Sequence, residues 1–158
     1  MKTPDRRHFL ALSLTWLGLS SVGILGCSDD GTGVDKALKP FVGKWRAQSM
    51  VLTNAANPAV SVDLVDEGAT FTLSILATGQ YSASLSALGQ TNTEVGIIEV
   101  SGNQVTITPT SPVGPSLVAT FAFQGDLLIL DGTSEFDFNL DGTAEAATAH
   151  IELYELDS

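Results

Sequence analysis

Beyond residue 40, apolar and polar residues follow one another with a period of two over most of the chain. The alternation is clearest at residues 70–75, 81–86 and 105–108, where apolar residues alternate with Ser and Thr. A period of two places successive side chains on opposite faces of a strand, so these segments predict half-buried β-strands. Further strand candidates lie at residues 45–53, 60–65, 95–101, 117–123, 127–130, 135–138 and 148–155.

Compact turn signals between these segments predict antiparallel neighbours. The signals are Thr78-Gly79, Gly102-Asn103, Gly125-Asp126, Asp131-Gly132 and Asp141-Gly142. The proline-rich stretch 109–115 predicts one longer loop, and no segment after residue 40 has the periodicity of an amphipathic helix. The sequence therefore predicts an all-β domain, an antiparallel up-and-down β-barrel of about 8–10 strands, with a β-sandwich as the alternative.

The first 26 residues are organised differently from the rest. A short basic region precedes an uncharged segment, residues 9–26, which ends against Cys27. This layout is typical of a cleavable signal peptide. A membrane-spanning helix needs roughly 20 predominantly apolar residues. Because Ser, Thr and Gly interrupt this apolar run, a cleaved signal peptide is favoured over a retained membrane anchor. Residues 28–39 are rich in Ser, Asp, Gly and Thr, and they predict a flexible tether about 20 Å long.

The basic region of this leader resembles a bacterial export motif. Arg6, Arg7, Phe9 and Leu10 are spaced as in the twin-arginine motif. The resemblance implies a route that usually carries proteins folded before export. The alternative is a general-secretion leader whose basic region holds two arginines.

The end of the leader resembles the lipobox of bacterial lipoproteins. Residues 24–27 read Ile-Leu-Gly-Cys, and the resemblance implies cleavage after Gly26 and attachment of lipid, such as palmitate, to Cys27. It also implies anchoring in the cell envelope, on the extracytoplasmic side of a bacterial membrane. Cys27 is the one cysteine of the chain, so no internal disulfide can form. Lipidation would remove an unpaired thiol from an oxidising compartment.

The charge of the chain is strongly one-sided. Seven Lys and Arg stand against 18 Asp and Glu; three basic residues and one acidic residue precede residue 27, so cleavage leaves four against 17, a net charge of −13. All four remaining basic residues lie between Lys36 and Arg46. Such a surface repels phosphate backbones, so we expect no nucleic-acid binding. Solubility through mutual repulsion explains the acidic excess, and cation binding is the alternative.

Residues 41–45, Phe-Val-Gly-Lys-Trp, resemble the Gly-x-Trp signature of lipocalins. The layout of the following segments is similar to that of lipocalin-like domains of bacterial lipoproteins. In that family the tryptophan, here Trp45 after Gly43, closes the base of an eight-stranded barrel. Together with the leader and the tether, this resemblance predicts three parts: a signal peptide at 1–26, a lipidated N-terminus and tether at 27–40, and a lipocalin-like β-domain at 41–158.

One stretch has the spacing of a calcium loop. Residues with side-chain oxygens occupy the first, third and fifth positions of this stretch, and a glycine follows at the sixth. Calcium loops have this spacing. The candidate ligands are Asp137, Asn139, Asp141, Thr143 and Glu145. The alternative is a β-hairpin without metal, in which Asp141-Gly142 forms the tight turn and the other polar residues face solvent.

No catalytic constellation is evident, so we do not expect an enzyme. His150 is the one histidine after residue 26, and no Gly-x-Ser-x-Gly elbow occurs. No cofactor other than calcium is expected. The sequence favours a membrane-anchored, noncatalytic module that binds an apolar small molecule or lipid. The alternative is a structural or protein-interaction module of the envelope, with a barrel filled by its own side chains and a protein partner.

Overall fold

The computed structural model of the chain describes residues 35–87 and 89–157. The signal-peptide motifs and Cys27 lie outside this part. The elements are one 3₁₀ turn, η1 (Lys39–Phe41), and the strands β1 (Gly43–Asn54), β2 (Ser61–Asp63), β3 (Thr70–Ile75), β4 (Gln80–Ala87), β5 (Gln90–Ser101), β6 (Gln104–Ser111), β7 (Leu117–Gln124), β8 (Leu127–Phe136) and β9 (Glu145–Glu155). In the described ranges, no helix is both long and apolar enough to span a membrane.

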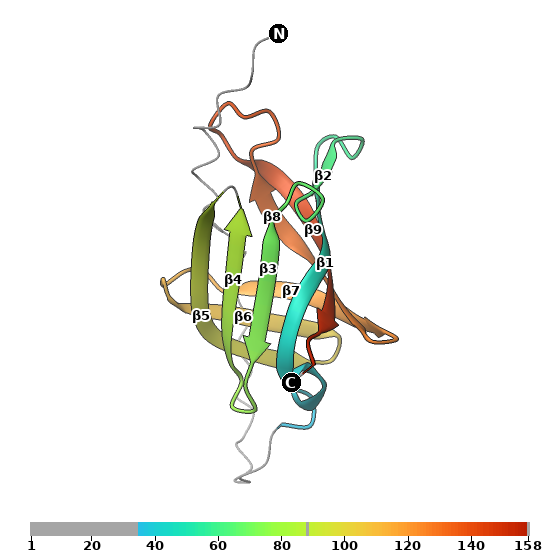
Figure 1. Cartoon of the computed structure of the whole chain (residues 1–158), viewed down its shortest axis with the longest axis vertical. Helices are drawn as coiled ribbons and strands as arrows, with labels where there is room; N and C mark the ends of the chain where they lie inside the picture. Colours follow the sequence, from blue (N-terminus) through green and yellow to red (C-terminus); the bar gives the residue numbers. More distant parts are fainter. Residues whose placement is uncertain (1–34, 88, 158) are drawn as a thin grey trace.

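The strands form one closed antiparallel barrel (Figure 1). Strands β3 to β9 pair in sequence order, and β1 pairs with β3 on one side and with β9 on the other, so that eight strands close the ring. The short β2 pairs with the second half of β1 and stands outside the ring. The predicted up-and-down barrel, lipocalin-like in layout, is therefore confirmed. The β-sandwich alternative is wrong, because the pairing of β1 with β9 closes a single sheet into a ring.

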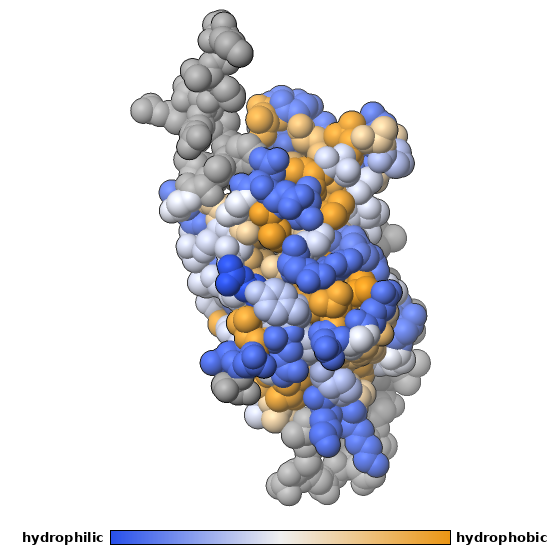
Figure 2. All heavy atoms as spheres, turned by 45° about the vertical axis from the view of Figure 1, so that its right-hand side comes forward, coloured by the Kyte–Doolittle hydropathy of each residue, from blue (hydrophilic) through white to orange (hydrophobic). Residues whose placement is uncertain are grey.

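The two-residue period separates an inner from an outer face. For example, Leu73 of β3 and Leu85 of β4 point inward and are buried. Ser82 of β4 points outward and is exposed. The same alternation occurs around the ring, and the buried residues form one hydrophobic core inside the barrel. Figure 2 shows hydrophilic and hydrophobic side chains interleaved on the outer surface of one side of the barrel.

Most predicted turns join the expected strands. Gly102 and Gly125 open two-residue hairpin turns with φ of 61° and 60°, the positive φ at the first turn position that favours glycine. The turn predicted at Asp131-Gly132 is wrong, because both residues lie inside β8. Strands β7 and β9 flank β8 on both sides at this point, and their ladder hydrogen bonds override the local turn preference of Asp-Gly.

One end of the barrel, here called the base, is closed by η1 and the start of β1. Phe41 is 1% exposed, and its ring lies 4.7 Å from that of Phe121 and 5.3 Å from that of Phe123. Trp45 is buried beside them, and its indole N–H donates a hydrogen bond of 2.8 Å to the Phe41 carbonyl. Gly43 has φ +154°, a backbone conformation that residues other than glycine rarely adopt. The opposite end, here called the rim, carries the loop at residues 137–144 (Figure 1), and the loop at residues 112–116 joins the ends of β6 and β7 that lie away from the base.

Candidate ligand cavity

Small residues leave space in the middle of the barrel. Ala119, Gly132 and Ala149 lie directly opposite one another on the neighbouring strands β7, β8 and β9. Ala83 lines the same space from β4. The result is a cavity of about 460 Å³, called the lumen cavity below. This volume exceeds the roughly 300 Å³ at which ligand pockets begin, so the barrel is not filled by its own side chains.

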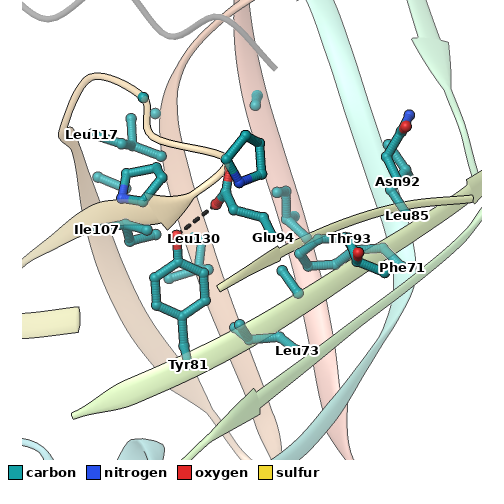
Figure 3. A pocket seen from close by; sticks show the side chains of 18 of the residues that line it. Phe71, Leu73, Tyr81, Leu85, Asn92, Thr93, Glu94, Ile107, Leu117 and Leu130 are labelled. Atoms are coloured by element: carbon teal, nitrogen blue, oxygen red, sulfur yellow. Dashed lines mark hydrogen bonds between the residues drawn. The ribbon is translucent and has the colours of Figure 1, made fainter. Parts of the chain in front are cut away.

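The walls of the lumen cavity are mainly apolar (Figure 3). The lining residues are Met50, Phe71, Leu73, Tyr81, Ala83, Leu85, Asn92, Thr93, Glu94, Ile107, Pro109, Pro112, Val113, Gly114, Pro115, Leu117, Ala119, Leu130, Gly132, Ala149 and Ile151. Asn92, Thr93 and Val113 are exposed, so the cavity communicates with solvent on the rim side. An apolar cavity that is open to solvent at one end suits a small molecule that is mainly apolar.

A phenol and a carboxylate form the polar centre of the cavity. The Tyr81 hydroxyl donates a hydrogen bond of 2.5 Å to Oε1 of Glu94 (Figure 3). Burial raises the pKa of Tyr81 above its ordinary value, and the hydrogen bond to Glu94 and the charge of that carboxylate raise it further. The phenol therefore stays protonated and remains a donor at neutral pH. Among the described residues, Glu94 is the one charged side chain that lines the cavity.

Gly96 makes room for the Tyr81 ring. The two residues are direct partners across β4 and β5, and a Cβ at position 96 would lie 2.7 Å from Cε1 of Tyr81 and 2.2 Å from the Thr108 carbonyl oxygen. Since real Cβ atoms do not approach so closely, only glycine fits. The ring can then lie over β5 and reach Glu94, which is two residues away on the same face.

The proline-rich loop forms part of the cavity wall at the rim. Pro112, Val113, Gly114 and Pro115 all line the cavity. The loop is tied down by an isolated bridge between Thr110 and Val113. The sequence predicts a loop at residues 109–115, but β6 extends to Ser111, so the loop covers residues 112–116. The sequence does not predict the role of this loop in the cavity wall. The available signal was its apolar composition, because a loop that faces only solvent has no need of exposed valine and proline at a barrel end.

The predicted calcium loop lies at the rim and is held by its own hydrogen bonds. Asp137 accepts bonds from the backbone N–H groups of Asp141 (3.1 Å) and Gly142 (2.8 Å), and Asp141 accepts one from Thr143 (2.8 Å). Oε1 of Glu145 accepts a bond of 2.9 Å from the Asn139 side chain.

These contacts do not assemble a metal centre. Within residues 35–87 and 89–157, no group of three or more His, Cys, Asp or Glu side chains is placed to hold a metal ion. Calcium binding by the loop stays a prediction. β8 and β9 do form an antiparallel hairpin across this loop, as the alternative expects. Its connection spans residues 137–144, and positive φ falls at Leu140 and Gly142.

His150 lies on the outer face of β9, away from the lumen cavity. Its Nδ1 is 2.6 Å from Oδ1 of Asp131, and its Nε2 is 3.5 Å from Oε1 of Glu152. The hydrogen bond with Asp131 is the main cause that raises the pKa of His150, against a smaller lowering by burial. The partners of this histidine are carboxylates, so its geometry is that of a surface ion pair.

No protein-family model matches the chain, and no curated protein matches it either. Three features of the described barrel bear on function: the aromatic closure of the base, the lumen cavity, and the one carboxylate that lines that cavity.

Proposed function

We propose that the chain is a lipid-anchored protein of the cell envelope whose barrel binds a small, mainly apolar molecule without catalysing a reaction. The observation that carries this proposal is the lumen cavity of about 460 Å³. Its volume falls in the lower half of the roughly 300–1,000 Å³ range of small-molecule sites. A ligand of moderate size would gain about 25 cal/mol for each Å² of apolar surface that it buries there.

Filling the cavity is expected to weaken binding without unfolding the barrel. The neutral fluorophore N-phenyl-1-naphthylamine should bind the native protein with a rise in emission, as it does in dry apolar sites. Ala149→Leu places three extra carbon atoms in the cavity, because Ala149 is buried and lines it. We expect Kd to rise at least about tenfold, or 1.4 kcal/mol, in a fluorescence titration.

Thr148→Leu is the matched control for this experiment. Thr148 is the preceding residue of β9 and is exposed on the outer face, so the same side chain is added outside the cavity. This variant should bind the probe as the native protein does. Equal affinities in the two variants would contradict binding in the lumen and would favour the protein-interaction alternative.

The anchor is the second part of the proposal. It is supported by the lipobox-like residues before Cys27 and by the basic residues near the base. Residues 35–38 lead directly into η1 at the base, and the four basic residues Lys36, Lys39, Lys44 and Arg46 are exposed on this part of the chain. A base turned toward anionic headgroups would leave the rim facing away from the membrane.

Cys27→Ser is expected to remove the lipid anchor. Cells grown with radiolabelled palmitate should incorporate label into the native protein and not into this variant, because the thioether needs the sulfur of Cys27. Ser28→Ala, one residue later, keeps the sulfur and should keep the label. Label that persists in Cys27→Ser would overturn the lipoprotein assignment.

A further inference from the structure

We infer that the lumen cavity selects an apolar molecule that carries an amine, and that Glu94 binds the protonated nitrogen. This inference rests on the proposed function, since it concerns the ligand class of the same cavity. Three features of the cavity favour an amine: the charge balance of the lining, the hydrogen bonds of Glu94, and the position of the carboxylate on β5, which is paired on both sides.

The charge balance of the lining favours a cation. Glu94 is negative, and none of the described residues that line the cavity is Lys, Arg or His. All Lys and Arg of the described part lie between Lys36 and Arg46, at the base. A ligand carboxylate would therefore be placed beside a like charge with no cation to offset it, whereas a ligand ammonium would meet an opposite charge at a half-buried carboxylate.

Among the described residues, one oxygen of the Glu94 carboxylate has a hydrogen-bond partner and the other has none. Oε1 accepts the bond from Tyr81, and Oε2 makes no hydrogen bond with any described residue. A carboxylate has room for about four donors. Because the Tyr81 hydrogen is already donated to Glu94, the cavity centre presents acceptors to a ligand. An ammonium group supplies three donors and no acceptor, which complements this arrangement.

The carboxylate is held in place before a ligand arrives. Glu94 lies opposite Ala83 in the ladder between β4 and β5, and its side chain is half-buried. The bond from the buried Tyr81 fixes one of its oxygens. The small side chain of Ala83 leaves open space directly across from the carboxylate. Preorganisation of this kind strengthens binding, because less side-chain freedom is lost with the ligand.

Three ligands with the same ten-carbon tail test this inference. Decylamine, 1-decanol and decanoate are titrated separately against the full mature chain loaded with N-phenyl-1-naphthylamine, at about 150 mM salt so that distant surface charge is screened. Decylamine is expected to displace the probe at a concentration about tenfold or more below that of decanoate, with decanol between them.

Glu94→Gln should abolish this order while the probe still binds. The amide keeps the size of the side chain and removes its charge. Glu99→Gln makes the same change on the exposed outer face of β5 and should keep the native order. Probe binding without a preference for decylamine, or a preference that persists in Glu94→Gln, would overturn the inference and leave the proposed function standing. A native protein that does not bind the probe would instead overturn the proposed function itself.

Discussion

Replacing Phe41 by alanine is expected to destabilise the barrel by about 3–5 kcal/mol, the usual cost of removing a large buried aromatic side chain. Phe41 is 1% exposed and packs edge-on against the rings of Phe121 and Phe123. The barrel cannot readily collapse to fill the space, because strands closed into a ring are fixed by their ladder hydrogen bonds. The loss should therefore include both the transfer of the ring and the cavity left behind.

Urea unfolding followed by tryptophan fluorescence would measure this change. Trp45 is the one tryptophan after residue 26, and its burial beside Phe41 makes it a local reporter; its emission should also shift to longer wavelength as water enters the base. Leu76→Ala is the control, since Leu76 is 53% exposed in the turn at the same end. That change should stay within about 0.5 kcal/mol. A loss below about 1 kcal/mol in Phe41→Ala would show that η1 does not close the base.

Gly96→Ala is expected to destabilise the protein by about 2–3 kcal/mol, toward the upper end for a side chain forced into a packed site. The added methyl group would lie 2.2 Å from the Thr108 carbonyl oxygen and 2.7 Å from the Tyr81 ring. Relief requires β5 and β6 to separate and the Tyr81 ring to move. Displacing the ring disturbs its hydrogen bond with Glu94, so the preference for an amine should weaken as well.

Gly114→Ala separates this steric effect from the general cost of replacing glycine. A Cβ at position 114 would meet its nearest atom, in Pro109, at 3.6 Å, which is ordinary contact, and Gly114 is not among the residues with positive φ. Its stability should change by about 0.5 kcal/mol or less in the same urea experiment. Equal losses at the two positions would contradict the specific role given to Gly96.

The sequence predicts the class of fold because each strand carries its own two-residue period. Segments such as 70–75 and 105–108 need no knowledge of their partners, and the glycine turns at positions 102 and 125 are local as well. The failure at Asp131-Gly132 has the opposite cause. Its turn signal is also local, but the conformation there is decided by β7 and β9, which lie far away in the sequence.

The lumen cavity could not be predicted in the same way. Ala119, Gly132 and Ala149 are unremarkable one by one, and only the registers of two ladders place them in one row. The same holds for Glu94 and Tyr81, which are separated by a hairpin and meet because Gly96 lets the ring cross. A period of two shows which residues face inward, but not which of them share a level of the barrel.

The pairing of the first strand with the last sets the order of events in folding. Residues of β1 such as Trp45 pair with residues of β9 such as Glu155, so the ring cannot close until the end of the chain is available. Contacts over such a long separation form slowly. Export through the twin-arginine route would require this last step to finish inside the cell. General secretion would postpone it to the far side of the membrane, where the unclosed edges of β1 and β9 would stay exposed to other chains.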